Sequence, residues 1–160
     1  MKTIRLHRTA SKETISAMAS ATLKNGGWLE VPPVTAEPKV GDKMPDGTIY
    51  AGVSPDTGKA MYATPADASL TMTFNQAKEY AAKFDAHGYQ DWRVPTKAEL
   101  NVLFNNRAAV GGFNVTCSTP AGWYWSASQS GIWGAWDQRF SDGAQSYDGK
   151  GDHLSVRCVR

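Results

Sequence analysis

The sequence lacks long apolar runs and any concentration of charge of one sign. No hydrophobic stretch in its 160 residues approaches the length of a membrane-spanning helix, so we expect no membrane insertion. The 17 basic and 15 acidic residues leave a net charge of +2, and no run of Lys or Arg concentrates it. The chain therefore lacks the electrostatic footprint of a nucleic-acid-binding protein.

Cysteine is scarce, because only Cys117 and Cys158 are present. They are able to form one disulfide or to remain two separate thiols. Met1–Arg8 is basic, but Thr9–Lys24 mixes polar and apolar residues instead of forming the continuous hydrophobic segment of a secretory signal. Without such a signal we favour reduced thiols, and a place in the cytoplasm or in a phage particle unless another route exports the protein.

Recognisable catalytic and metal-binding patterns are missing as well. No Ser-His-Asp, Cys-His or paired acid–base arrangement stands out, and Gly111-Gly112 lacks the lysine and following helix of a phosphate loop. His87 precedes Gly88 at an expected helix end, where the helix dipole accounts for a basic residue. We therefore expect no enzyme, no cofactor and no bound metal.

The most informative stretch that is present runs from Tyr89 to Leu100. Pro95 disfavours the helical conformation in the residue before it, so Trp92–Val94 should be extended. Thr96 followed three residues later by Glu99 is a capping box, which predicts a helix start. The apolar positions at helical spacing after it are Leu100, Leu103 and Phe104.

A second capping box and a hairpin precede this stretch. Thr73 and Gln76 predict the start of a helix that Gly88 would end. Asp46–Ala63 has two alternating arms around the turn-forming residues Pro55–Gly58, which predicts a β-hairpin. The apolar positions of the predicted helix are Ala77, Tyr80, Ala81 and Phe84.

The first forty residues form a separate extension in this interpretation, and residues 41–160 form the domain. An oligomerisation or attachment role for residues 1–40 and a merely structural one are both open. The elements expected there are a strand around Ile4–Leu6, a helix over Ser11–Lys24, a strand at Trp28–Val31 and a Pro-rich arm over Pro32–Val40.

The last forty residues are rich in Trp, Tyr, Gly, Ser and Asp and lose helical periodicity. In the strand expected at Ala135–Phe140, Trp136 and Phe140 should face the core with Gln138, and Asp137 and Arg139 should face solvent. Glycine turns should join this strand to the others. The other expected strands are near Tyr124–Ser126, Ala144–Tyr147 and Ser155–Val159.

Gly88–Leu100 resembles the "G-x-x-DWRLPT-x-x-EL" signature of the Lcl C-terminal domain family, bacterial and phage-borne domains named for the tip of a collagen-like adhesin. The resemblance implies an α+β, C-type-lectin-like fold with two helices flanking a mixed, mainly antiparallel sheet. The resemblance to the Lcl C-terminal domain family continues in the segments Gly111–Phe113, Tyr124–Ser128, Ala135–Trp136, Phe140–Gly143 and Val156–Arg160. A more distant likeness is to formylglycine-generating-type enzymes.

The composition of the C-terminal region and the resemblance both indicate a binding surface. Tyr and Trp are rigid anchors, and Ser, Gly, Asp and Gln are adaptable contacts. In C-type-lectin-like domains this part of the sheet forms the ligand face, and in some phage and bacterial members diversity-generating retroelements rewrite it. We expect a protein or glycan ligand, and include a homo-oligomer because repeated weak sites gain avidity. The expected contact residues are Gln129, Ser130, Ile132, Trp133, Asp137, Arg139, Gln145, Tyr147, Asp148, Lys150, Asp152 and His153.

Two other functions compete with a plain binding module. A calcium-dependent lectin would use converging oxygens, but the Glu-Pro-Asn, Gln-Pro-Asp and Trp-Asn-Asp patterns of such lectins are missing. A formylglycine-generating-type oxidase would need closely placed, copper-binding cysteines, whereas Cys117 lies outside any matching motif. The carboxylates considered for calcium are Asp137, Asp142, Asp148 and Asp152.

Overall fold

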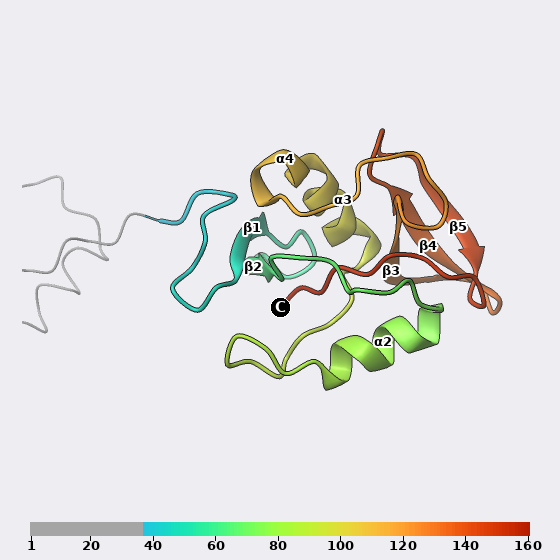
Figure 1. The fold of residues 1–160 in the computed structure, drawn as a ribbon, viewed down its shortest axis with the longest axis horizontal. Helices are drawn as coiled ribbons and strands as arrows, with labels where there is room; N and C mark the ends of the chain where they lie inside the picture. The colour runs from blue at the N-terminus through green and yellow to red at the C-terminus, as the bar shows by residue number, and fades with distance from the viewer. Residues whose placement is uncertain (1–36) are drawn as a thin grey trace, which may run out of the picture. The chain divides into compact units, whose positions relative to one another are not determined.

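Five strands and three helices make up residues 37–160, the part of the chain that the computed structural model describes (Figure 1). Pro38–Arg160 form one unit. The strands and helix expected within residues 1–36 lie outside the described residues. The elements are β1 (Ile49–Val53), β2 (Ala60–Ala63), α2 (Phe74–Lys83), α3 (Lys97–Asn105), α4 (Arg107–Val110), β3 (Trp123–Ser130), β4 (Gly134–Arg139) and β5 (Gln145–Gly149).

The predicted N-terminal hairpin is confirmed, because β1 and β2 pair antiparallel. The register shifts between Tyr50 and Gly52, where the backbone of Gly52 has a φ of 115°. Such a positive φ favours glycine. Beside this irregularity Asn106 donates a hydrogen bond of 2.9 Å to the Ala51 carbonyl, which ties the hairpin to the end of α3.

The C-terminal strands form a separate antiparallel sheet in the order β3-β4-β5. The prediction of a strand at Ser155–Val159 is wrong. This segment makes isolated bridges instead, with Tyr124 through Ser155 and with Ala63 and Arg93 through Val159. It therefore connects the hairpin to the three-stranded sheet. The α+β class and the mainly antiparallel pairing are as expected.

Both predicted capping boxes are confirmed at the starts of α2 and α3. The Thr73 hydroxyl accepts from the Gln76 N–H at 3.4 Å, and the Gln76 side chain accepts from the Thr73 N–H at 3.0 Å. The predicted end of α2 at Gly88 is wrong, because Phe84 is already extended. His87 consequently lies outside the helix, where its Nδ1 is 2.9 Å from the Asp46 carbonyl oxygen.

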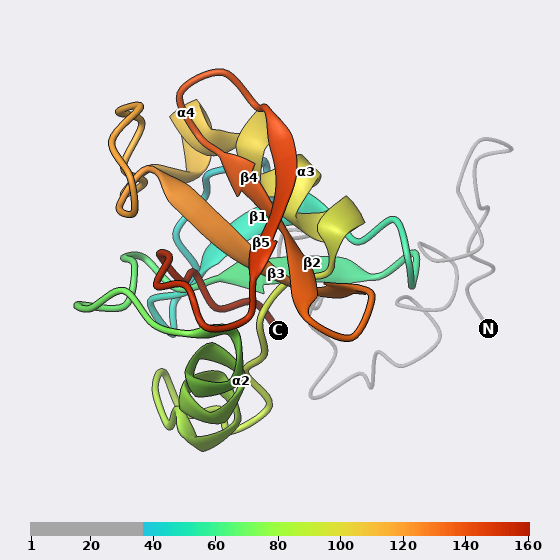
Figure 2. The same cartoon turned by 90° about the vertical axis from the view of Figure 1, so that its right-hand side faces the viewer.

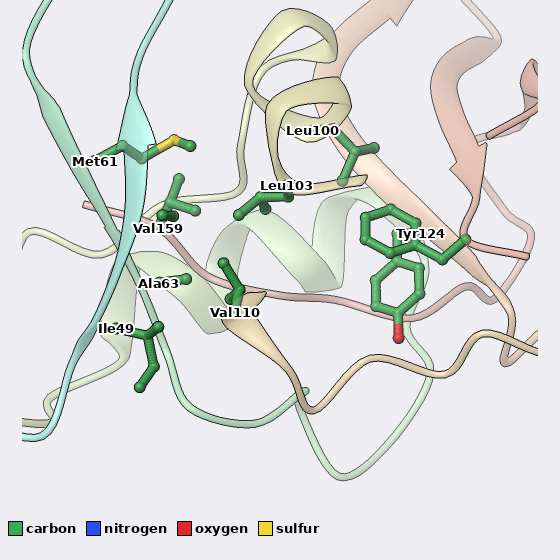
Figure 3. Close-up of a cluster of buried hydrophobic side chains, with 10 residues drawn as sticks. Ile49, Met61, Ala63, Leu100, Leu103, Val110, Tyr124 and Val159 are labelled. Atoms are coloured by element: carbon green, nitrogen blue, oxygen red, sulfur yellow. The ribbon is translucent and has the colours of Figure 1, made fainter. Parts of the chain in front are cut away.

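Helix α2 lies on one side of the C-terminal segment, and α3 and α4 lie on the other, as both views show (Figures 1 and 2). Strand β3 buries side chains on both of its faces. Tyr124 belongs to a buried cluster that also contains Leu100 and Leu103 of α3 and the hairpin residues Met61 and Ala63 (Figure 3). The next residue along the strand points to the opposite face. There Trp125 packs in a second cluster with Phe74, Ala77 and Ala81 of α2.

The Trp92–Thr96 junction is fixed by a buried carboxylate at the start of α3. Arg93 donates two hydrogen bonds, of 2.5 and 2.7 Å, to the Glu99 carboxylate. The Ser54 hydroxyl, at 2.6 Å, and the Thr96 N–H, at 3.0 Å, donate to the same carboxylate. These contacts fix α3 against both the extended segment and the hairpin, so this motif has a structural role.

Candidate functional site

The hairpin tip, which we define as Gly131, Ile132 and Trp133, projects two large apolar side chains from the β3–β4 loop. Ile132 is 79% exposed and Trp133 is 83% exposed. Gly131 has a φ of 77°, which favours glycine at this turn. The tip therefore presents apolar surface to solvent beyond the end of the sheet, as expected for a contact region.

Lys150 holds the hairpin tip in place. Its ammonium donates to the Gln129 side-chain oxygen at 2.5 Å and to the Ile132 carbonyl at 2.7 Å. Its backbone N–H donates to the Trp133 carbonyl at 2.8 Å. Because one residue satisfies the side chain before the turn and the carbonyls within it, the tip is ordered without burying Ile132 or Trp133.

The outer face, which we define as Trp136, Gln145 and Tyr147, continues from the tip along β4 and β5. Trp136 lies opposite Tyr147 across the strands, and their ring centroids are 5.8 Å apart in an edge-to-face arrangement. Tyr147 is 61% exposed. A Cβ on Gly134 would lie 3.6 Å from the Tyr147 ring, so the ring lies beside the base of the tip.

A shallow groove of about 410 Å³, lined by several residues with polar side chains, lies beside this face, at the start of α3. The Lys97 ammonium lies 3.0 Å from the centroid of the Trp136 ring, and its backbone N–H donates to the Ser128 hydroxyl at 2.9 Å. The Asn101 side-chain oxygen accepts from Gln138 at 3.0 Å, which leaves the Asn101 amide group as a donor to the groove. The lining residues are Asp56, Thr96, Lys97, Ala98, Asn101, Ser128 and Gln145.

Most of this groove was not predicted from the sequence; of its lining, only Gln145 was among the expected contact residues. Lys97 did carry a signal, because the capping box places it in the first turn of a helix beside the sheet. Asp56 and Asn101 carried none, since they meet only through the contact between the hairpin and α3. Trp136 was expected in the core, but it is half-buried and belongs to neither core cluster.

The expectation that Asp137 faces solvent is wrong, because its side chain is 1% exposed. Strand β4 is the middle strand of the sheet, and Asp137 lies on the face that packs toward α2. Ala135, which shares a face with Asp137, belongs to the core cluster packed on α2. Gln138 on the other face is also 1% exposed. Asp137 is therefore not available for direct ligand contact.

The expected contact residues divide between two ends of the sheet. Arg139 lies at the end of β4 away from the tip, where it forms a two-pronged pair with Asp142 at 2.9 and 2.5 Å. The His153 Nδ1 lies 3.4 Å from the Thr71 carbonyl oxygen. The residues at the tip end of the sheet are Gln129, Ser130, Ile132, Trp133, Asp148, Lys150, Asp152 and His153, of which Ser130, Asp148 and Lys150 are half-buried.

Electrostatics at the tip end of the sheet are dominated by acidic groups. Burial, together with the negative charges of Asp148 and Asp152, raises the pKa of Asp137 to about 7, although the Asp148 N–H partly offsets this effect. Burial and the Asp152 charge also raise the pKa of Asp148. The Asp148 N–H is close enough to Asp137 to lower its pKa, but no donor lies in hydrogen-bonding geometry with either carboxylate oxygen of Asp137.

The remaining groups of chemical interest are the side chains of metal-ligating type and the two cysteines. Within residues 37–160, no group of three or more His, Cys, Asp or Glu side chains is arranged to hold a metal ion. Cys117 is exposed and Cys158 is buried, and the two are not bridged. Burial raises the pKa of the Cys158 thiol to about 12, so this thiol stays protonated. No helix among the described residues has the length and apolar character to cross a membrane.

A comparison with protein families gives a match over most of the described residues. The family model described as the Lcl C-terminal domain matches residues 53–160, which include the hairpin tip, the outer face and all residues of the groove. No curated protein matches the sequence.

Proposed function

The chain belongs to the Lcl C-terminal domain family, and from that premise we propose that it is a non-catalytic module that binds a protein or glycan ligand. Its binding surface combines the hairpin tip with the outer face of the β3-β4-β5 sheet and the adjoining groove. In this proposal the described unit has the C-type-lectin-like fold that the family resemblance implies.

The observation that carries the proposal is the grouping of ordered, exposed apolar side chains at the tip end of the sheet. Ile132, Trp133 and Tyr147 are three of the seven large hydrophobic residues that are exposed in the described part of the chain. The other four are single aliphatic residues on other segments: Val40, Val53, Leu70 and Val115.

Such a grouping favours recognition, because large aromatic side chains give much contact area at low entropic cost. Buried Trp and Tyr residues are also the usual energetic centres of protein interfaces. The groove beside Tyr147 adds hydrogen-bonding groups from Lys97, Asn101 and Gln145, which fix the orientation of a ligand. These properties serve protein and glycan ligands alike.

The exposed residues of this surface are separated from the residues that stabilise the fold. Ile132, Trp133 and Tyr147 are exposed and belong to neither core cluster. They are therefore replaceable without loss of core packing, which suits a variable protein of a diversity-generating retroelement or the tip of a phage or bacterial adhesin. Presentation as a homo-oligomer would increase the avidity of a weak site.

A binding array tests the proposal. The full chain, fluorescently labelled, is applied to arrays of purified glycans and of cell-surface proteins beside the variants Trp133→Ala, Tyr147→Ala and Leu70→Ala. We expect bound spots that weaken about tenfold or more in the first two variants, since hot-spot aromatics contribute about 2 kcal/mol or more. Leu70, which is 71% exposed, is the matched control and should leave binding unchanged. Equal loss in all three variants, or no binding at all, would overturn the proposal.

A further inference from the structure

Asp137 is a buried carboxyl group without a counter-charge, and the nearby Asp148 N–H offsets the effect of its burial only in part. Its side chain is 1% exposed, and neither of its oxygens has a hydrogen-bond partner. Burying an ionised carboxylate without a counter-charge or hydrogen bonds is strongly unfavourable, so such a group takes up a proton, binds a cation or forces its surroundings to open. The Arg93–Glu99 pair shows how the same fold compensates a carboxylate that must stay charged.

The groups that surround Asp137 make the charged form less favourable. From β3, Trp125 lies directly across the ladder and is fully buried. From β5, the Asp137 neighbour is Ser146, and the charge of Asp148 lies close enough to raise the Asp137 pKa. The turn after β5 contributes the further negative charge of Asp152.

The basic side chain of this region is directed elsewhere. The Lys150 ammonium is bonded to Gln129 and to the carbonyls of Gly131 and Ile132, and it lies 5.6 Å from the Phe74 ring centroid. From α2, the Lys78 ammonium lies 5.5 Å from the same ring. Neither lysine donates a hydrogen bond to Asp137. The charges directed at Asp137 are therefore those of two carboxylates.

We propose that Asp137 is protonated when the hairpin tip is ordered. When Asp137 ionises, its negative charge repels Asp148 and Asp152 and so loosens the turn after β5. That turn carries Lys150, and Lys150 holds the tip. A proton on Asp137 is in this way linked to the order of Ile132 and Trp133. The functional consequence, weaker ligand binding above neutral pH, rests on the proposed function, whereas the structural linkage does not.

Nuclear magnetic resonance of the full chain tests the linkage directly. The Asp137 carboxyl carbon is followed against pH, and the protection factor of the Lys150 amide, which is bonded to the Trp133 carbonyl, is measured at pH 6 and pH 8. We expect a midpoint near 7 and a protection factor that falls about tenfold between the two pH values, since one pKa unit corresponds to a tenfold change in the equilibrium. Asp137→Asn should remove this change, and Asp142→Asn, on the exposed pair with Arg139, should keep it.

A second variant keeps the proposal falsifiable if Asp137→Asn does not fold. Asp148→Asn removes one of the two repelling charges, so it should lower the midpoint of Asp137 and reduce the loss of Lys150 protection between pH 6 and pH 8. A midpoint of Asp137 near 4, or a Lys150 protection factor that is the same at pH 6 and pH 8, overturns the proposal.

Calcium provides the competing explanation for an unpartnered carboxyl group beside two carboxylates. Excess calcium chloride should leave the melting temperature and the Asp137 midpoint unchanged. Stabilisation by calcium in the wild-type protein that Asp137→Asn abolishes would mean that a cation, not a proton, fills the site, and would overturn the proposal. If the arrays bind no ligand at either pH while Asp137 and Lys150 titrate together, the binding function fails and the linkage stands.

Discussion

Two buried carboxylates, one in the junction before α3 and one in the middle of the three-stranded sheet, show opposite solutions to the same problem. Glu99 is fully buried and accepts hydrogen bonds from Arg93, Ser54 and the Thr96 N–H. Asp137 is almost as deeply buried and accepts none. The junction is therefore built around a charge, and the sheet contains a group that is stable there only without one.

The two sites consequently depend on pH with opposite sign. Burial by itself would raise the pKa of Glu99, but hydrogen bonds from Arg93 and Ser54 outweigh it and lower the pKa to about 2. The stability that Glu99 contributes is present above its ordinary pKa of 4.5 and is lost as the pH falls toward 2. Asp137, with its pKa raised from 3.8 to about 7, contributes most below 3.8 and loses that contribution as the pH rises through 7.

The largest effect on stability should come from replacing Glu99, the buried carboxylate that is compensated by hydrogen bonds. Glu99→Gln leaves Arg93 without its carboxylate partner, and loss of one member of a buried pair costs about 3 kcal/mol of unfolding free energy, at the low end because the Arg93 side chain is 42% exposed. Urea denaturation at pH 7 measures this loss. Asp142→Asn breaks the exposed pair with Arg139 and should cost much less, because solvent screens this pair. Equal losses in the two variants would contradict the structural role assigned to Glu99.

The next largest effect on stability should come from replacing Asp137, the buried carboxyl group that accepts no hydrogen bond. Asp137→Asn removes the ionisation, so its unfolding free energy relative to that of the wild-type protein should rise by about 2–4 kcal/mol between pH 4 and pH 8, because a shift of one pKa unit is worth about 1.4 kcal/mol. Urea denaturation of both proteins at pH 4, 6 and 8 gives the difference and cancels the other carboxylates. A constant difference across this range would mean that Asp137 is already charged at pH 4.

The compensated site was largely readable from the sequence, because its contacts are local. Thr96 and Glu99 are three residues apart, and a capping box requires only that spacing. The same reasoning identified Thr73 and Gln76 at the start of α2. It failed at the end of α2, where Phe84 leaves the helix because its ring packs edge-to-face on Trp92 instead of continuing the helical register.

The uncompensated site was not readable, because burial in a middle strand depends on what covers each face. The alternation of Trp136, Asp137 and Gln138 is typical of a strand with one solvent-exposed face. In β4 the face of Asp137 packs toward α2, and on the other face α3 covers Gln138 through Asn101 but leaves Trp136 half-buried, so both Asp137 and Gln138 are buried. The groove has the same origin, since Asp56 and Thr96, which bond to each other through their side chains, are far apart in the sequence.

A smaller effect tests whether the turn beside Asp137 controls the tip. Lys150→Met keeps the aliphatic stem but removes the bonds to Gln129 and Ile132, each worth about 1 kcal/mol. Hydrogen exchange of the residue-150 amide, which bonds the Trp133 carbonyl of the tip, should accelerate while the core of α3 is unchanged. Lys59→Met, an exposed lysine in the β1–β2 turn, is the matched control. Unchanged exchange of the residue-150 amide would show that the Lys150 side chain does not anchor the tip.

The smallest effect on stability should come from replacing a residue of the hairpin tip itself, which belongs to the proposed binding surface. Trp133 is 83% exposed and belongs to neither core cluster, so Trp133→Ser should change the unfolding free energy by no more than about 0.5 kcal/mol. Trp125→Ser, in contrast, removes a fully buried ring and should cost about 3 kcal/mol or more. Urea denaturation of both variants measures the difference. A loss above 1 kcal/mol in Trp133→Ser would mean that the ring stabilises the fold, and its exposure would no longer support a ligand-binding role.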